Sequence, residues 1–186
     1  MIDHDRVALS NLNRQILYWE GDIGRKKVDS ARAKLRSLNS AVEIETIAEI
    51  ITERNVSEFV GNCEVIVDAM DNLPTRYLLN RCAIQRHIPF IHGAVYGFKG
   101  RAMTILPGET ACLRCIYRGL VPLEKFPVIG VVPAVIGGIQ ATEVIKCLVG
   151  IGQLLANRLL IYDGLEGTFS ELKVNKNPDC DHCGSP

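Results

Sequence analysis

Four cysteines in two pairs are the strongest chemical signal in this sequence. Cys112 and Cys115 form one CxxC pair, and Cys180 and Cys183 form the other. Together the pairs supply the four thiolates of a closed tetrahedral zinc site, because a two-residue gap lets one turn present both sulfur atoms to one ion. Such a site has no position for water, so we expect a structural zinc that clips the C-terminal segment onto the domain. The alternative is a set of unrelated buried or redox-active cysteines.

The other cysteines and the histidines give weaker signals. Three cysteines lie within apolar strand or helix patterns, where cysteine behaves as a small hydrophobic residue. These are Cys63, Cys82 and Cys147. His182 lies within the second CxxC pair and is an alternative zinc ligand, although the CxxC geometry favours sulfur. We expect His87 and His92 to be packing or surface residues.

An aspartate follows a short apolar run in "VIVDAMDN". Asp71, with Asn72, comes where a buried parallel strand would end, which is where open α/β sheets place ligands. A carboxylate at this edge suits a magnesium ion shared with substrate phosphates. Asp68 comes three residues earlier and is expected to be more embedded in the strand. The alternative is that Asp71 is only a loop residue at the start of the next helix.

The opening segment "MIDHDRVALSNLNRQ" carries a third group of polar residues. Asp3 follows what could be the end of a strand, where nucleotide-binding folds place an acidic residue that accepts hydrogen bonds from ribose hydroxyls. Arg14 and Lys27 could neutralise phosphate charge. The alternative is that these charged residues are solvated surface.

Apolar periodicity predicts the elements that position these residues. The predicted helices are 24–39, 52–61, 74–86 and 133–148. The predicted strands are 42–47, 63–71, 89–97, 101–108, 158–164 and 169–174. Alternating helices and buried strands indicate one α/β domain over residues 1–186, with an at least partly parallel sheet and antiparallel C-terminal strands. The helix 133–148 is expected to be core or dimer interface.

Composition excludes several classes of partner. The 186 residues carry 21 basic and 21 acidic side chains and a net charge of zero, so no field favours nucleic acid or anionic lipid. No uninterrupted apolar stretch reaches the roughly 18 residues of a membrane span, and the chain begins without a secretion-signal pattern. We therefore expect a cytoplasmic protein that binds neither nucleic acid nor membrane.

Five segments in this order resemble the ThiF/MoeB/HesA family, the prokaryotic relatives of ubiquitin-activating enzymes. They are "DHDRVALSNLNRQ", "GRKKVDSARAKL", "VDAMDN", "CLRC" and "NPDCDHCG". The resemblance implies a Rossmann-like adenylation domain with a mostly parallel sheet. It implies an adenylyltransferase that uses ATP and Mg²⁺ to adenylate the C-terminal glycine of a ubiquitin-fold sulfur-carrier protein, as in molybdopterin or thiamine sulfur transfer. It also implies a homodimer with one structural Zn²⁺ in each subunit.

The same resemblance assigns roles to individual residues. Asp3 would bind the ATP ribose, and Lys27 would contact phosphate. Asp71 with Asn72 would hold magnesium near the reacting α-phosphate. The residues that would line the nucleotide and its phosphates are Ser10, Asn11 and Arg14.

The sequence departs from the family pattern in two places. Members that form a thioester or persulfide carry a cysteine in the loop after the first CxxC pair, whereas Ile116–Val132 has none, so we expect an adenylation-only protein closest to the molybdopterin-synthase-activating branch. The family also begins with a helical arm, a first strand and a glycine-rich turn that are absent here. Without that strand, neighbouring strands should have unpaired backbone groups. We expect a fragment or late-start reading with Met1 inside the second strand; otherwise another chain or a rearranged edge supplies the pairing.

Two other functions compete with adenylation. One is a catalytically silent relative that acts as a zinc-stabilised docking scaffold for a ubiquitin-fold partner, which the missing glycine-rich turn favours. The other is a piece of a nicotinamide dehydrogenase, which leaves the four cysteines unexplained.

Overall fold

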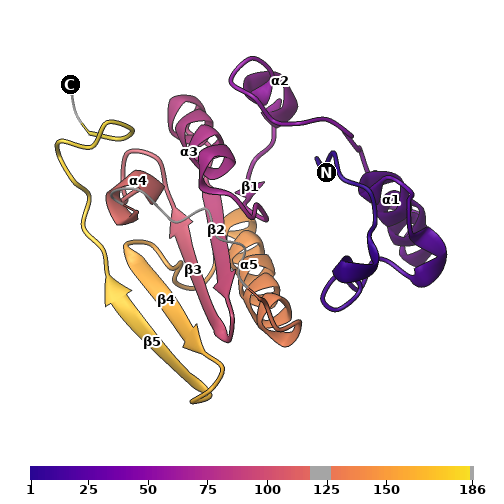
Figure 1. Cartoon of the computed structure of the whole chain (residues 1–186). Helices are drawn as coiled ribbons and strands as arrows, with labels where there is room; N and C mark the ends of the chain where they lie inside the picture. The colour runs from indigo at the N-terminus through magenta and orange to yellow at the C-terminus, as the bar shows by residue number, and fades with distance from the viewer. Residues whose placement is uncertain (118–126, 185–186) are drawn as a thin grey trace. The chain divides into compact units, whose positions relative to one another are not determined.

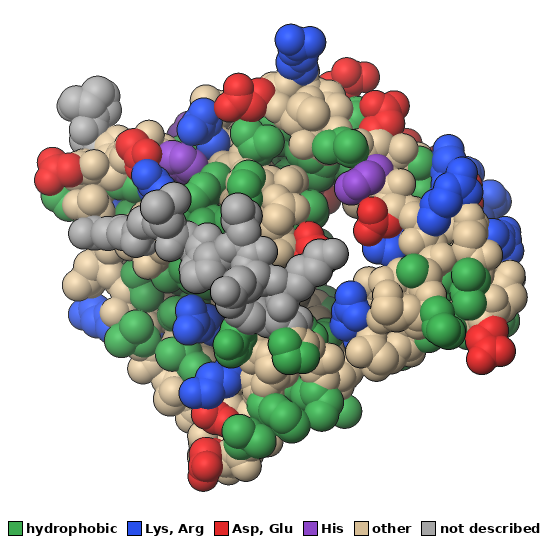
Figure 2. All heavy atoms as spheres, in the orientation of Figure 1, with side chains coloured by type: hydrophobic (Ala, Val, Ile, Leu, Met, Phe, Trp, Pro, Cys, Tyr) green, Lys and Arg blue, Asp and Glu red, His purple; other side chains and the backbone are tan. Residues whose placement is uncertain are grey.

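The computed structural model describes residues 1–117 and 127–184 of the chain. These residues form two compact units, Met1–Phe59 and Val60–Pro186, which are described separately below (Figure 1). On the face in Figure 2, charged side chains of both signs are spread over the surface, as the zero net charge would suggest.

The first unit is built around the amphipathic helix α1, Lys27–Leu38. Its apolar face buries Val28 and Ala31, three residues apart, which is the spacing that places side chains on one face of a helix. Two short 3₁₀ helices, η1 Leu9–Asn11 and η2 Glu20–Asp22, precede it. The prediction of a helix in this region is confirmed.

The strand predicted at 42–47 is reduced to a single parallel bridge between Ile2 and Ile47. Two backbone hydrogen bonds hold it: Asp3 N donates to Ile47 O at 3.1 Å, and Ile47 N donates to Met1 O at 2.9 Å. A strand needs a partner along its whole length, and only Met1–Asp3 pairs with this segment. The alternation of apolar and polar residues at 42–47 is therefore not accompanied by a ladder of strand hydrogen bonds, and the predicted strand is wrong in extent.

The second unit contains a five-stranded sheet in the order β1-β2-β3-β4-β5. The strands are β1 Ile66–Val67, β2 Phe90–Tyr96, β3 Lys99–Ile105, β4 Arg158–Asp163 and β5 Thr168–Lys173. β1 pairs with β2 in parallel, and the three later pairings are antiparallel. The α/β class with antiparallel C-terminal strands is confirmed, and the parallel pairing in this sheet is confined to β1 and β2.

β1 differs from the prediction in length and exposure. The apolar run predicted a long strand buried on both faces, but β1 has two residues, and Val67 is 47% exposed. β1 lies at the edge of the described sheet, so one side of its backbone has no ladder partner there.

Within the described residues of this unit, three helices follow or pack near the strands: α3 Leu73–Arg86, α4 Leu113–Ile116 and α5 Val131–Val149. The short helix α2, Val56–Val60, spans the boundary between the two units. The Asn72 side chain caps α3 by accepting a hydrogen bond from Thr75 N at 2.9 Å, and a proline occupies the first turn. α3 and α5 match the predicted helices within two residues at each end.

α5 has the length and composition of a membrane-spanning helix, a test that core helices of soluble proteins also pass. The sequence analysis counted only uninterrupted apolar runs as possible membrane spans. The predicted helix 133–148 was therefore not counted, because it contains Glu143 and Lys146. Glu143 is 2% exposed and accepts hydrogen bonds from Thr104 Oγ1 (2.5 Å) and Leu155 N (2.7 Å). α5 packs on β2 and β3 (Figure 1).

Candidate functional site

The four paired cysteines meet in the second unit. Their sulfur atoms all lie within 4.8 Å of one another, and all four residues are buried. Cys112 Sγ lies 4.0 Å from Cys115 Sγ and 3.7 Å from Cys180 Sγ, and Cys115 Sγ lies 3.5 Å from Cys183 Sγ. Four sulfurs at about 2.3 Å from a zinc ion form a tetrahedron with edges of about 3.8 Å. The donor set and its spacing therefore fit a four-sulfur zinc site.

Each half of the cluster is a tight turn. Cys115 N donates to Cys112 O at 3.0 Å, and Gly184 N donates to Cys180 O at 2.8 Å. Asn177 N also donates to Cys115 Sγ at 3.4 Å. The turns thus present two sulfurs each, as the CxxC spacing predicted.

A buried asparagine links the two halves. Asn80, on α3, has no exposed surface. Its Oδ1 accepts a hydrogen bond from Leu113 N at 3.0 Å, and its Nδ2 donates to His182 Nδ1 at 2.9 Å. His182 thus faces α3 and is not one of the clustered groups. The alternative of His182 as a ligand is not supported by this geometry.

Burial raises the pKa of two of these thiols, Cys112 and Cys183. The pKa of Cys112 rises to about 11, and the pKa of Cys183 rises further. Burial acts in the same direction on Cys180, but hydrogen bonds from the His182 and Cys183 backbone N–H groups and from the Cys112 and Cys183 side chains together outweigh it and lower its pKa. A cation would favour the thiolate form that metal binding requires.

Asp71 and Asn72 lie between β1 and α3, and both are exposed. Asn72 Nδ2 donates to Asp71 Oδ1 at 3.4 Å, while Asn72 Oδ1 accepts the Thr75 N–H that caps α3. The Asp71 carboxylate is therefore presented to solvent beside a helix start, where it fits a magnesium ligand. One lone pair of the Asn72 carbonyl is already used by the cap, which leaves the second for any other partner.

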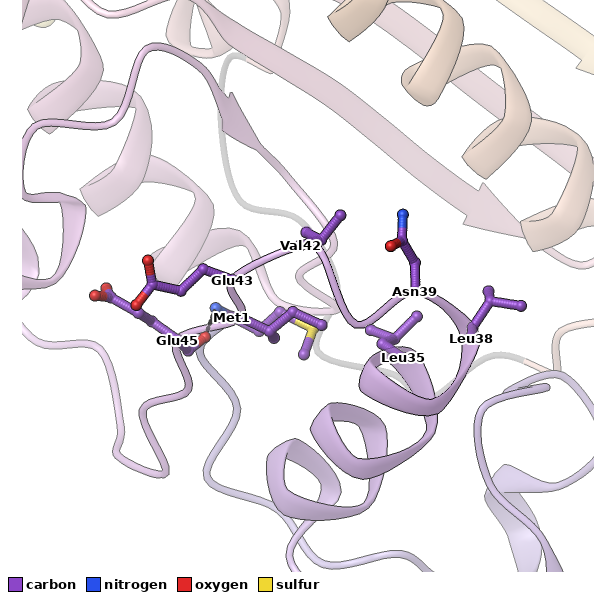
Figure 3. Close-up of a pocket in the computed structure, with 8 residues that line it drawn as sticks. Met1, Leu35, Leu38, Asn39, Val42, Glu43 and Glu45 are labelled. Carbon is purple, nitrogen blue, oxygen red and sulfur yellow. Dashed lines mark hydrogen bonds between the residues drawn. The ribbon is translucent and has the colours of Figure 1, made fainter.

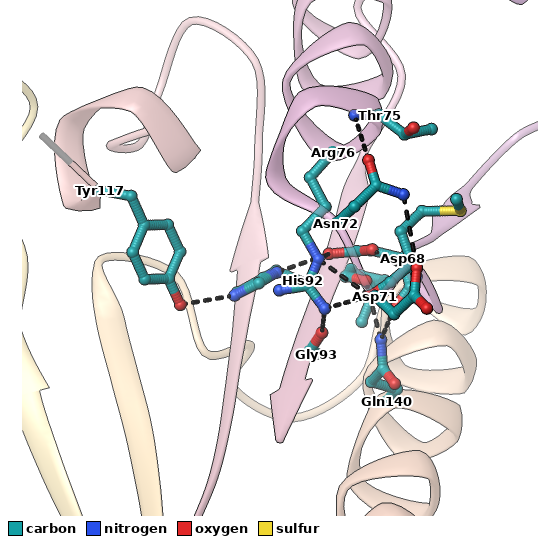
Figure 4. Close-up of polar contacts among 11 residues, drawn as sticks. Asp68, Asp71, Asn72, Thr75, Arg76, His92, Gly93, Tyr117 and Gln140 are labelled. Carbon is teal, nitrogen blue, oxygen red and sulfur yellow. Dashed lines mark hydrogen bonds and ion pairs between the residues drawn. The ribbon is translucent and has the colours of Figure 1, made fainter. Parts of the chain in front are cut away.

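Sequence reasoning missed the group of buried polar residues behind this turn. Asp68 and His92 both have no exposed surface, and His92 Nδ1 lies 2.7 Å from Asp68 Oδ2. Arg76 Nε lies 3.4 Å from the same oxygen, and Gln140 Nε2 donates to Asp68 O at 2.8 Å (Figure 4). His92 was predicted to be a packing or surface residue. A histidine inside a predicted buried strand was the available signal, since buried polar groups need partners.

In the first unit, Lys27 is held by two carboxylates. Its side chain is 7% exposed, and Nζ lies 2.7 Å from Asp5 Oδ2 and 3.5 Å from Asp3 Oδ2. The hydrogen bond from Lys27 lowers the pKa of Asp5. The structure therefore brings together Asp3 and Lys27, two of the predicted site residues, as an ion pair.

The other predicted residues of this unit lie in and after η1. Asn11 Oδ1 accepts a hydrogen bond from Ala8 N at 2.9 Å. Arg14 Nη1 donates to Ser10 O at 3.1 Å and to Asn13 Oδ1 at 2.9 Å. Ser10, Asn11 and Arg14 thus share one local turn.

The first unit also holds a pocket of about 600 Å³ beside the C-terminal end of α1 (Figure 3). It is lined by Met1, Leu35, Leu38, Asn39, Val42, Glu43, Ile44 and Glu45. None of the predicted site residues lines this pocket, so it is separate from the chemistry predicted for this unit.

The comparison with protein families decides which group of proteins this is. The model of the ThiF family matches residues 1–182. The chain belongs to the ThiF family. The resemblance seen in the five sequence segments is thereby confirmed.

Relatives of this ThiF-family chain cover nearly all of it. The "SAMP-activating enzyme E1" of Haloferax volcanii is 42% identical over 99% of the chain and 70% of its own length. The "Sulfur carrier protein adenylyltransferase" of Thermus thermophilus is 40% identical over 99% of the chain and 72% of its own length. "Adenylyltransferase and sulfurtransferase MOCS3" of Sus scrofa is 37% identical, and the chain spans only 42% of it. Two of these relatives are named adenylyltransferases, which is the expected enzyme class, and the other is named an activating enzyme.

Solved structures show the same fold. E. coli MccB has a TM-score of 0.88 at 22% identity, covering 99% of this chain and 58% of MccB. The structure of MccB with ATP has a TM-score of 0.84 and covers 98% of this chain. At this identity the likeness concerns the fold alone, and the chain spans somewhat more than half of MccB.

Proposed function

We propose that this chain adenylates the C-terminal glycine of a ubiquitin-fold sulfur-carrier protein. The observation that carries the proposal is the similarity, over 99% of the chain and at least 70% of their length, to two relatives named for activating SAMP and for adenylylating a sulfur carrier protein. Membership of the ThiF family supports the use of ATP.

In this reaction a carboxylate oxygen of the carrier forms a bond to the α-phosphorus of ATP, and the bond between the α- and β-phosphates breaks to release pyrophosphate. The protein mainly supplies positioning and charge neutralisation. Arg14 and Lys27 would meet phosphate charge, and Asp3 would accept hydrogen bonds from the ribose. Ser10 and Asn11 would line the nucleotide.

Asp71 is the proposed magnesium ligand, with Asn72 beside it. Its exposed carboxylate lies two residues before the start of α3, and hard oxygen donors are those that Mg²⁺ prefers. When bound, Mg²⁺ would neutralise phosphate charge. The four-cysteine cluster would hold Zn²⁺ in a closed structural site.

The finer parts of the proposal come from the family resemblance of the five sequence segments and, for the location, from composition. We include a homodimer, a cytoplasmic location, and molybdopterin or thiamine sulfur transfer as the pathway. The absence of cysteine from Ile116–Val132 supports an adenylation-only protein, although 118–126 lie outside the described residues.

One observation favours the docking scaffold as the second candidate. Lys27 Nζ is buried between the carboxylates of Asp3 and Asp5, so a phosphate would have to compete with two negative charges for it. A scaffold would bind the carrier without turning over ATP.

The test is carrier-dependent exchange of radiolabelled pyrophosphate into ATP by the full-length protein encoded in the genome. We expect exchange in the parent and a loss of roughly a hundredfold or more in Asp71→Asn, because a metal-binding carboxylate is removed. Glu166→Gln, an equal loss of charge at an exposed turn between β4 and β5, is the control. Carrier binding without exchange in the parent would replace the enzyme by the scaffold.

A further inference from the structure

The turn that carries Asp71 is held in place from three separate elements. It follows β1 and runs from Asp68 to Asn72. Polar side chains of α3, β2 and α5 bind its backbone or the Asp68 side chain: Arg76, His92 and Gln140 (Figure 4).

Arg76 forms the most direct link to Asp71. Its Nε donates to Met70 O at 3.1 Å, and its Nη2 donates to the same carbonyl oxygen and to Gly93 O at 2.9 Å. Met70 precedes Asp71 in the chain. The guanidinium therefore ties the peptide group that leads into Asp71 to strand β2, with its side chain only 13% exposed.

His92 holds the other end of the turn. A carboxylate only accepts hydrogen bonds, so His92 Nδ1 carries the proton that faces Asp68 Oδ2 at 2.7 Å. The other ring nitrogen of neutral His92 is then an acceptor, and Tyr117 Oη donates to it at 3.0 Å. Asp68 Oδ1 in turn accepts Met70 N at 3.0 Å. The His92 ring thus fixes the carboxylate that holds the Met70 amide.

Gln140, on α5, holds the start of the turn against strand β2. Its Nε2 donates to Asp68 O at 2.8 Å and to Ile91 O at 3.1 Å. The carbonyl and the amide of Met70, and the carbonyl of Asp68, all have partners in this network. Asp71 itself keeps an exposed carboxylate, and both backbone groups of the preceding residue, Met70, are hydrogen-bonded.

We propose that Arg76 and His92 are positioning residues that fix the Asp68–Asn72 turn and so set how strongly Asp71 binds a divalent cation. This inference rests on the proposed magnesium role of Asp71. Neither residue needs to touch the cation or the substrate. Their contribution is to remove the conformational freedom that the turn would otherwise lose on binding.

The experiment measures cation binding directly in the full-length protein. Mn²⁺ serves as the probe, and electron paramagnetic resonance measures its binding in the presence of a non-hydrolysable ATP analogue. We expect Arg76→Met to weaken Mn²⁺ binding about tenfold and to raise the Mg²⁺ concentration for half-maximal exchange by the same factor. Arg76→Lys keeps the charge, but a lysine has no planar fork that reaches both carbonyl oxygens. Its affinity for Mn²⁺ should therefore lie between those of the parent and Arg76→Met.

Controls separate positioning from stability. Arg86→Met makes the same change at an exposed position of α3 and should leave Mn²⁺ binding unchanged. Melting temperatures are measured for every variant. Equal Mn²⁺ binding in Arg76→Met and Arg86→Met would overturn the proposal, even with a lower melting temperature for Arg76→Met. If Arg76→Met does not fold, Arg76→Lys and His92→Gln decide instead, and parent-like Mn²⁺ binding in both would overturn it.

Asp71→Asn separates a failure of the magnesium role of Asp71 from a failure of the positioning role of Arg76 and His92. If it binds Mn²⁺ as the parent does, the magnesium role in the proposed function is wrong. If it loses Mn²⁺ binding while the Arg76 and His92 variants keep it, only the positioning role is wrong.

Discussion

Cys115 Sγ lies 3.5 Å from Cys183 Sγ, although 68 residues separate the two cysteines in the sequence. A bound ion at this point would join the segment after β3 to the C-terminal segment. Its binding free energy would then also be folding free energy, because the unfolded chain does not hold the four sulfurs together.

We therefore predict that Cys180→Ser lowers the free energy of unfolding by about 3 kcal/mol or more and releases zinc. Urea unfolding and elemental analysis of the purified protein measure the two effects. Cys63→Ser is the control, since Cys63 lies outside the cluster and is exposed; the prediction that it packs in the core is wrong. A Cys180→Ser protein as stable as the parent, with parental protein free of zinc, would contradict the structural-zinc assignment.

Gly93 leaves space for the Gln140 side chain. A Cβ atom at Gly93 would lie 2.4 Å from Gln140 Cδ, so we predict that Gly93→Ala lowers the free energy of unfolding by about 1 to 3 kcal/mol. In the double variant with Gln140→Ala the collision is absent, and the loss should be smaller than the sum of the single losses. Gly137→Ala on α5 is the control, because nothing lies within 4 Å of its added Cβ. Additive losses in the double variant would show that the collision is not the cause.

His92 makes stability depend on pH. Burial lowers the pKa of His92 below its usual 6.5, and the hydrogen bond with Asp68 opposes this only in part, while Arg76 and Arg101 add to it. Below about pH 6.5 the unfolded chain binds a proton at this residue that the folded chain does not, so stability falls as pH falls. The Tyr117 hydroxyl also faces the ring and loses its acceptor when the ring is protonated.

We predict that the stability lost between pH 7.5 and 5.5 is smaller in His92→Gln than in the parent, by at most about 1.4 kcal/mol per pH unit. Urea unfolding at the two pH values measures it. The other histidines are present in both proteins, so their effects cancel in the difference. Equal losses in parent and variant would contradict the assignment to His92.

Two helices and three strands were predicted most accurately from the sequence. The predicted strands 89–97, 158–164 and 169–174 match β2, β4 and β5 within one residue at each end. The predicted helices 74–86 and 133–148 match α3 and α5 within two residues, because the periodicity of a helix is a local property. The predicted strands 42–47 and 63–71 shrink to one bridge and to the two residues of β1. A strand depends on a neighbour elsewhere in the chain, which a local pattern does not specify.

The site residues that form local patterns could be predicted from the sequence, whereas contacts between distant segments could not. The four clustered cysteines could be found because each CxxC pair is local and a thiolate set has few other uses. The network around Asp68 was missed because Gln140, 72 residues away, and His92, 24 residues away, converge on it only in the fold. Lys27 was predicted to contact phosphate, and its ion pairs with Asp3 and Asp5 could not be read from the spacing.

The most direct measurement of the central claim is the intact mass of the carrier protein after incubation with ATP, Mg²⁺ and the full-length enzyme. The account predicts that the carrier gains one AMP group, and that a carrier lacking its C-terminal glycine gains none. A carrier that binds the protein but never gains AMP would contradict the adenylation activity.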